Sequence, residues 1–264
     1  MATTLHRRRL PGAAGAAPAS RRKRGVFLAQ LSWNAAEKLF SAGRPVLIPL
    51  GAAAKEHGPH LPLGNDFLLA EYLAAAVAAR AEVLIAPTLN YGYYPAFVEY
   101  PGSVSLRLET ARDLILDICR GYAGFGARSF YVLNTGISTL HALRPAAKTL
   151  AAEGLLLRYT DLSRILAPVE ARLSEQAGGS HADEIETSIM LFIAPRSVRM
   201  RAAVSEYRPG KGPLTRDPRN RAGVYSASGV WGDPTLATRR KGKLLVEALV
   251  RGIVEDLRDL NAAA

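Results

Sequence analysis

From Val26 onward, short apolar runs that are typical of buried strands alternate with longer segments whose apolar residues recur at helical spacing. The predicted strands are 45–51, 82–92, 129–136 and 155–162, and the predicted helices are 66–80, 106–122, 138–153, 184–193 and 234–260. Strands that alternate with helices favour a mostly parallel sheet covered on both faces. We therefore expect an α/β fold over residues 26–264, built as a single-domain three-layer sandwich.

The first 25 residues differ from this body in composition. They hold 7 of the 34 basic residues, no acid, and the Ala-, Gly- and Pro-rich stretch 10–20. Such a segment has little apolar surface to bury and is predicted to be a disordered basic tail. Because it carries so much of the net charge of +11, that charge is weak evidence for a nucleic-acid partner. A solvated extension is the favoured interpretation.

Cysteine use and hydropathy restrict the class of protein further. Cys119 is the only cysteine, which excludes an intramolecular disulfide framework and any zinc module built from several cysteines. The tail lacks the apolar core of a secretory signal, and no run approaches the roughly 20 apolar residues that span a bilayer. We expect a cytoplasmic protein without a membrane contact.

Histidines and carboxylates gather in two short segments, GAAAKEHGPHLPLGND (51–66) and SHADEIETS (180–188). Imidazole together with carboxylate is a ligand set for Zn²⁺, Mn²⁺ or Fe²⁺. The first segment directly follows a predicted strand, and in parallel sheets sites form where strands end. The alternative is that the first segment is a polar turn and that Asp66 caps the next helix. The acids of the second segment adjoin an apolar run, where a charge needs a partner.

Four motifs in order resemble the creatininase (creatinine amidohydrolase) family, over about residues 27–260. The first is IPLGAAAKEHGPHLPLGND (48–66), and the second is YGYYPAFVEYPGS (91–103). The third is HADEIETS (181–188), and the fourth is GVWGDPTLAT (229–238).

The resemblance implies a sandwiched α/β fold and a small-molecule substrate. It also implies one or two divalent ions (Zn, Mn or Fe) and hydrolysis of a C–N bond in a cyclic amide or formamide by a metal-activated water. Family members are often ring-like, so a homo-oligomer is expected. The metal ligands that the resemblance implies are Glu56, His57, Glu184 and a bridging Asp66. His181 is expected to pass a proton to the leaving nitrogen, and Glu186 is expected to act beside it.

The chain also departs from the family pattern. The family places an acid two residues before the first histidine, where this chain has Lys55, although Glu56 is one residue away. After the third strand, Gly136 replaces the usual metal-binding histidine, and Ser138 replaces an optional glutamate. Phe97 stands where a histidine is often found. Asp183 and His141 are candidate replacement ligands, although an ordinary helix histidine is an equally good interpretation of His141.

The remaining candidates would line a substrate pocket: His60, Tyr91, Tyr94, Asn134, Ser138 and Trp231. The aromatic residues among them could equally be core, and Asn134 could simply close a turn. Three interpretations of the whole chain follow, in decreasing order of preference. The metal centre persists with altered ligands, or one metal remains with altered chemistry, or the chain is a non-catalytic member that binds a small molecule.

Overall fold

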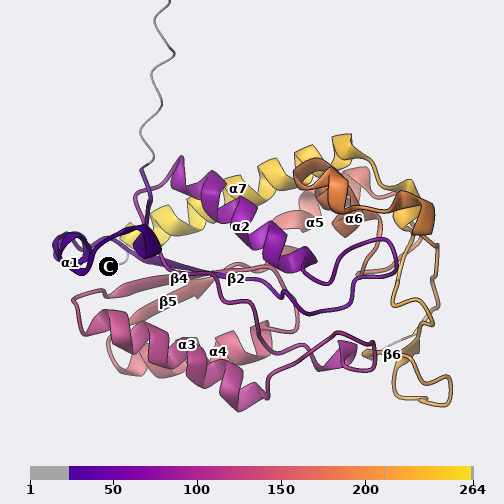
Figure 1. Ribbon diagram of the computed structural model, residues 1–264, viewed down its shortest axis with the longest axis horizontal. Helices are drawn as coiled ribbons and strands as arrows, with labels where there is room; N and C mark the ends of the chain where they lie inside the picture. Colours follow the sequence, from indigo (N-terminus) through magenta and orange to yellow (C-terminus); the bar gives the residue numbers. More distant parts are fainter. Residues whose placement is uncertain (1–23, 211, 263–264) are drawn as a thin grey trace, which may run out of the picture.

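The computed structural model describes residues 24–210 and 212–262 and has a five-stranded parallel sheet between two layers of helices (Figure 1). The strands, in the order β1-β3-β2-β4-β5, are β1 (Val26–Phe27), β3 (Leu84–Ile85), β2 (Val46–Leu50), β4 (Ser129–Asn134) and β5 (Leu156–Tyr159). All four pairings are parallel, so the predicted fold class is confirmed.

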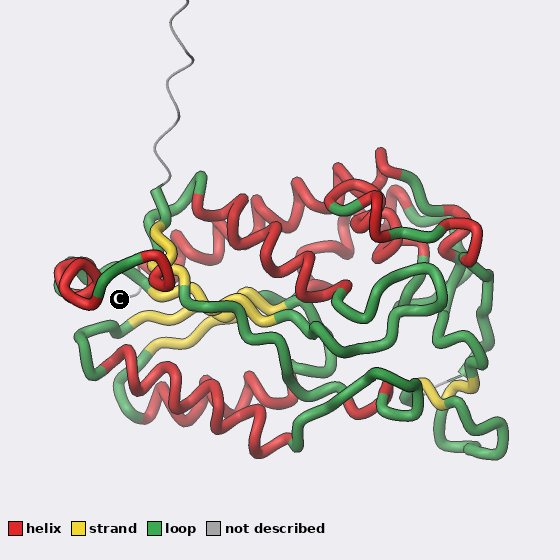
Figure 2. Tube along the Cα trace, in the orientation of Figure 1, coloured by secondary structure: helices red, strands yellow, loops and turns green. Residues whose placement is uncertain are grey.

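Each face of the sheet carries its own apolar core. One layer consists of α2 (Asn65–Ala78), α5 (Leu162–Leu173), α6 (Glu184–Ile193) and α7 (Arg239–Ala262). The opposite layer consists of α3 (Leu108–Ala123) and α4 (Leu140–Ala152), with α1 (Trp33–Phe40) near the sheet edge (Figure 2). Strand side chains alternate between the two cores, because Tyr131 and Leu133 of β4 join the first and Phe130 and Val132 join the second.

Several element boundaries differ from the prediction. The expected strand 82–92 forms a continuous strand only over Leu84–Ile85, because Pro87 lacks the N–H that would extend the ladder, and it pairs again through a single bridge between Leu89 and Leu50. Helix α7 begins at Arg239, after a separate 3-10 turn, Pro234–Leu236. Helices α1 and α5 and strand β1 were not predicted. Outside the central sheet, the segment 214–225 contains a small parallel pair, β6 (Leu214–Thr215) and β7 (Val224–Tyr225).

The strand order creates a switch point beside β2. The chain leaves β2 through α2 on one face to reach β3, then returns through α3 on the other face to β4. The loops that follow β2 and β4 therefore run to opposite faces of the sheet and leave a crevice between them. In α/β proteins, a crevice at the carboxyl ends of the strands is the usual place where ligands bind. The start of α2 packs tightly here, since a Cβ on Gly51 would lie 2.2 Å from the carbonyl oxygen of Asp66.

Two expectations concern the chain outside the sheet. The predicted basic tail falls almost wholly on residues 1–23, which lie outside the described residues. Among the helices that the structure describes, none is both long enough and apolar enough to cross a membrane.

Candidate active site

The loop that follows β2 folds back on the first turn of α2. His57 and Asp66 are both buried, and the Nδ1 of His57 lies 3.0 Å from the Lys55 carbonyl oxygen. A carbonyl oxygen can only accept, so His57 Nδ1 carries the hydrogen and Nε2 turns toward Asp66 Oδ1, 2.9 Å away. Asp66 lies in the first turn of α2, where the helix dipole favours a negative charge.

The second segment is held by backbone pairing and by a helix cap. His181 exchanges backbone hydrogen bonds with Trp231, at 2.9 and 3.3 Å. Ala182 then adopts a left-handed conformation, with φ of 48°, and donates its N–H to Glu186 Oε2 at 2.6 Å. The Asp183 side chain caps α6 by accepting the N–H groups of Ile185 and Glu186. This turn directs His181 and Glu186 toward the loop that follows β2.

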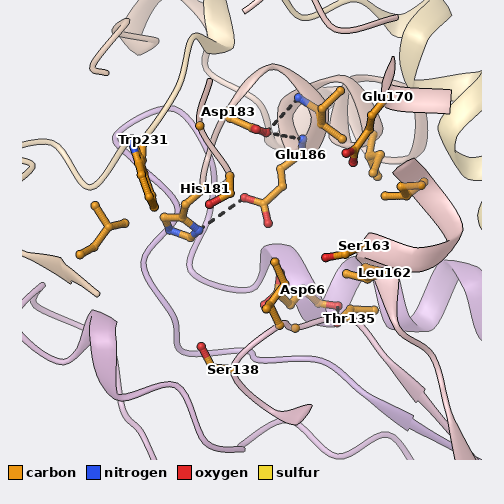
Figure 3. Close-up of a pocket in the computed structure, with 18 of the residues that line it drawn as sticks. Asp66, Thr135, Ser138, Leu162, Ser163, Glu170, His181, Asp183, Glu186 and Trp231 are labelled. Atoms are coloured by element: carbon orange, nitrogen blue, oxygen red, sulfur yellow. Dashed lines mark hydrogen bonds and ion pairs between the residues drawn. The ribbon is translucent and has the colours of Figure 1, made fainter. Parts of the chain in front are cut away.

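The two segments meet at the carboxyl edge of the sheet. The rings of His57 and His181 have centroids 4.9 Å apart, and His181 Nδ1 lies 3.5 Å from Glu186 Oε2 (Figure 3). His57, His181 and Glu186 each offer one ligand atom, and these three atoms lie within 4.8 Å of one another. Two imidazoles and one carboxylate at this spacing form a donor set suited to a divalent transition-metal ion.

Hydrogen bonds fix which ring nitrogens are available. His181 Nε2 lies 3.0 Å from the backbone carbonyl oxygen of Glu56, so this nitrogen carries the hydrogen and Nδ1 keeps its lone pair. Glu56 also places its Oε2 3.1 Å from the same nitrogen, and its Oε1 accepts the N–H of Gly58. His57 Nε2, 2.9 Å from Asp66 Oδ1, and the Nδ1 lone pair of His181, 3.5 Å from Glu186 Oε2, therefore converge. A lone pair cannot face a carboxylate oxygen at 2.9 Å, so a proton or a bound cation completes the contact between His57 and Asp66. One divalent ion fits the residues present.

Burial and charge act together on the acids of the site. Burial raises the pKa of Glu186 to about 7, even though the neighbouring charges of His181 and Lys55 lower it. Burial would also raise the pKa of Asp66, but Lys55 and His57 outweigh it and hold the pKa below its ordinary value. Burial would lower the pKa of Lys55, but the carboxylates of Asp66, Glu186 and Glu56 raise it overall. Lys55 is therefore a buried ammonium at neutral pH.

A cavity of about 640 Å³ opens from these residues (Figure 3). One wall is α5, which contributes Leu162, Leu166 and Glu170, and another is the 135–138 turn that follows β4. The Phe97 ring lies 4.4 Å from the His181 ring, centroid to centroid, and closes the cavity on that side. This volume suits a small molecule or a short peptide segment.

Two of the six predicted pocket residues, Ser138 and Trp231, line this cavity. The structure does not place the other four there. Tyr91 is 43% exposed and lies over a small apolar hollow beside α3, whereas the buried Tyr94 accepts the Gly92 N–H. The buried His60 ring bonds Thr187 Oγ1 at 2.8 Å. Asn134 closes its own turn by bonding the backbone of Gly136.

Glu184 was expected as a metal ligand, but the structure places its carboxylate elsewhere. Positions two apart on a helix point to different faces, so Glu184 turns away from Glu186. Its oxygens accept from Lys241 Nζ and from the backbone amides of Glu175 and Gln176, at 2.8 and 2.9 Å. Burial would raise the pKa of Glu184, but these donors lower it below its ordinary value. Glu184 thus joins α6 to α7.

The two candidate replacement ligands are also engaged elsewhere. Asp183 borders the cavity, but its Oδ1 caps α6 and its Oδ2 accepts from Gln176 at 2.7 Å. His141 is exposed on α4, with its ring edge toward Tyr93. Neither belongs to the three-residue donor group described above.

Sequence reasoning missed the α5 wall and the position of Lys55. No helix was predicted over 162–173, because Pro168 interrupts its helical pattern. The available signal was Asp161, which caps α5 by accepting the Arg164 N–H at 3.3 Å. Lys55 was expected to remove a ligand and to add a positive charge beside the metals, but its contact with Asp66, Nζ to Oδ2 at 2.7 Å, was not predicted.

The ion pair between Glu184 and Lys241 leads to a first prediction, which concerns the stability of the fold. Lys241→Met leaves a fully buried carboxylate without its cation, so we expect the free energy of unfolding to fall by about 2 kcal/mol. Urea denaturation would measure this. Lys243→Met, two residues along the same helix at an exposed ion pair, is the matched control and should change stability by less than about 0.5 kcal/mol. Equal losses in both variants would contradict a structural role for Glu184.

The protein is a parallel α/β sandwich whose histidines and carboxylates lie at the carboxyl edge of the sheet, which is where α/β enzymes place their active sites. The chain belongs to the creatininase family, because the family model described as creatinine amidohydrolase matches residues 29–257. A mycofactocin precursor peptide peptidase from Mycobacterium ulcerans (strain Agy99) is 30% identical over 86% of this chain and 90% of its own length. A creatinine amidohydrolase from Pseudomonas putida is 29% identical over 89% of this chain and 97% of its own length.

Solved structures agree with this assignment. A crystal structure of creatinine amidohydrolase superposes with a TM-score of 0.77 at 26% identity, covering 89% of this chain and 98% of that one. Two further creatininase structures, each 26% identical, are described as a mutant of Zn–Zn type and as an Mn form, with TM-scores of 0.75 and 0.76. The match with the Zn–Zn form covers 88% of this chain and 97% of that structure's chain. The match with the Mn form covers 89% of this chain and 98% of that structure's chain. The relatives named here are thus amidohydrolases and a peptidase.

Proposed function

We propose that this protein hydrolyses an amide-type C–N bond in a small molecule or short peptide, with one divalent metal ion held by His57, His181 and Glu186. The observation that carries the proposal is the convergence of these three donors at the end of the 640 Å³ cavity, which His181 and Glu186 line and behind which His57 is buried. Zn, Mn and Fe are the candidate ions for this ligand set. The named activities of the relatives support hydrolysis of a C–N bond.

The residues around the cavity would have different roles in the reaction. A divalent ion, when bound, would stabilise negative charge on a carbonyl oxygen and lower the pKa of water. Glu186 Oε1 has no hydrogen bond from any described residue, whereas its Oε2 is fixed by the Ala182 N–H. That free oxygen can accept a proton from the attacking water and return it to the leaving nitrogen. The aromatic Phe97 and Trp231 exclude bulk water from the His181 side.

This arrangement changes two roles that the family resemblance implied. His181 becomes a ligand through Nδ1, because its Nε2 hydrogen is bound by the Glu56 carbonyl. Glu56 becomes a residue that positions His181, because both of its carboxylate oxygens already accept hydrogen bonds. Asp66 remains beside His57 and pairs with the Lys55 ammonium.

Metal content and hydrolysis together test the proposal. ICP-MS on protein purified without a His tag or chelators should find close to one Zn, Mn or Fe per chain. A panel of cyclic amides, formamides and short peptides should then show metal-dependent release of an amine. Protein that retains no metal after reconstitution, or that cleaves nothing on the panel in its metal-loaded form, would contradict the proposal.

A second candidate function is binding without catalysis. It is favoured by Lys55, Gly136 and Ser138, which surround the site and supply no imidazole or carboxylate to a metal. In that case the cavity would hold a small molecule whose affinity is independent of metal. Isothermal titration calorimetry with and without EDTA would measure the affinity for compounds of the panel that bind. An affinity that EDTA does not change would favour binding without catalysis.

The polar groups of the cavity away from the donors indicate the substrate class. Glu170 on α5 lines the cavity, its carboxylate has no hydrogen bond or ion pair with a described residue, and burial raises its pKa. Asn65 is buried, and its Oδ1 has no partner among the described residues. Both are acceptors in a wall that also carries polar groups such as Ser163, Gln176 and Asp183. We propose a substrate that carries N–H donors, such as an amine or guanidinium, beyond the scissile amide.

The proposed contact of Glu170 with the substrate leads to a prediction about KM. Glu170→Gln should raise KM for an amine-bearing substrate about tenfold, which corresponds to loss of about 1.4 kcal/mol from a hydrogen bond with a charged group. The kcat should change little, because Glu170 lies away from the donor group. Glu175→Gln, exposed on the neighbouring turn, is the control. An unchanged KM, or an equal change for a substrate without an amine, would contradict the prediction.

A further inference from the structure

The strongest unexplained feature of the site is a buried lysine beside the proposed metal ligands. Lys55 is 5% exposed, and its Nζ donates to Asp66 Oδ2 at 2.7 Å. The same ammonium lies 4.9 Å from the centroid of the Phe97 ring, close enough for a cation–π contact. A lysine is rarely buried this deeply without a partner, and here the partner is Asp66, whose other oxygen contacts His57 of the donor group.

The two oxygens of Asp66 face different neighbours. Oδ1 lies 2.9 Å from His57 Nε2, whereas Oδ2 is bound by Lys55. A carboxylate that bridges two metal ions gives one oxygen to each of them. In this chain the ammonium holds the oxygen that a second ion would need.

The rest of a second metal site is also missing. The turn after β4 faces the cavity through Gly136, Ile137 and Ser138, which offer no imidazole or carboxylate. Glu56, the nearest other acid in sequence, uses both of its oxygens on Gly58 and His181. The donors that remain suffice for one ion, and they leave the Lys55 side of Asp66 without any.

We propose that the Lys55 ammonium is a built-in cation that takes the place of a second metal ion beside Asp66, so that the chain binds one ion at most. This inference rests on the proposed function for its first ion. It identifies a positioning residue, since Lys55 neutralises Asp66 and fixes its orientation toward His57. It also assigns a permanent positive charge to the end of the cavity where the substrate carbonyl would lie.

The local backbone permits a direct test in which the missing donors are restored. Gly136 does not have a left-handed φ, and a Cβ there would meet nothing closer than Thr139 Oγ1 at 3.3 Å. The variant Lys55→Glu/Gly136→His therefore supplies an acid and an imidazole around Asp66. After loading with Zn²⁺ and gel filtration, we expect ICP-MS to find one ion in the native chain and two in this variant.

The outcomes separate this inference from the proposed function. Two ions in the native chain would overturn the role of Lys55 and leave the hydrolase proposal intact. No ion in the native chain but one in the variant would support the role of Lys55 and overturn the metal-dependent hydrolase. A folded variant that binds no more metal than the native chain would overturn the inference.

A second variant keeps the inference testable if the first one misfolds. Lys55→Gln removes the charge and adds no metal-binding acid, so a neighbouring ion would no longer be repelled. We expect the Kd for Zn²⁺, measured by competition with a chromophoric chelator, to fall about tenfold. Lys148→Gln, on α4 and away from the cavity, should leave Kd unchanged. An unchanged or larger Kd in Lys55→Gln would show that the ammonium is not beside the ion.

Discussion

Replacing His57 by Ala is expected to lower kcat/KM for amide hydrolysis by on the order of 10³-fold, with loss of the bound metal. His57 directs Nε2 toward Asp66 and the donor group, and no neighbouring imidazole can replace it, because His181 already belongs to that group and His60 is bonded to Thr187 Oγ1. Its ring is buried, but the hydrogen bond it donates to the Lys55 carbonyl lies within one loop, so the fold should persist. Kinetics and ICP-MS on the same sample would measure both effects.

His141→Ala is the matched control for this substitution. It makes the same chemical change at an exposed position on α4, outside the donor group and the cavity. We expect its metal content and kcat/KM to stay within about twofold of the native values. Equal losses in the two variants, or full activity in His57→Ala, would contradict the proposed centre.

Gly242→Ala is expected to lower the free energy of unfolding by about 3 kcal/mol, at the upper end of the usual cost of overpacking. A Cβ at this position in α7 would lie 1.8 Å from the carbonyl oxygen of Ser188 in α6. The obstacle is backbone, so rotation of a side chain cannot relieve it. The helices must separate, and α6 carries Glu186 into the site.

Gly121→Ala provides the corresponding control within α3. No atom lies within 4 Å of the new Cβ there, so this substitution should stabilise the fold by about 0.5–1 kcal/mol through the higher helix propensity of Ala. Chemical denaturation of both variants would test the pair. A small effect of Gly242→Ala would show that α6 and α7 pack less closely than described.

The fold was largely predictable because its signals are local. β2 and β4 are continuous apolar runs, as a strand buried on both faces requires, and α3 has apolar residues at helical spacing. Local signals failed where a proline breaks the pattern, as in α5, or where pairing covers only two residues, as in β3 and β1. Those elements depend on contacts with distant parts of the chain.

The site was predictable as a set of segments but less so as a set of contacts. Residues 55–66 and 181–186 do meet, as their positions beside the sheet indicated. Sequence spacing alone could not show that Glu184 turns toward α7 or that Asp183 is used as a helix cap. The direction of a side chain at a helix start depends on the cap, and the cap became visible only with the structure.

The strand order has a consequence for how ligands and folding are coupled. The donors come from positions more than 120 residues apart, and they approach only when β2 is flanked by both β3 and β4 and α6 has docked on α7. A partly folded chain therefore has no binding site to offer. Any ligand that enters this centre must raise the melting temperature of the entire domain, by an amount set by its concentration relative to Kd. A thermal-shift screen of metals and amines thus reports directly on the chemistry of the cavity, before any substrate is known.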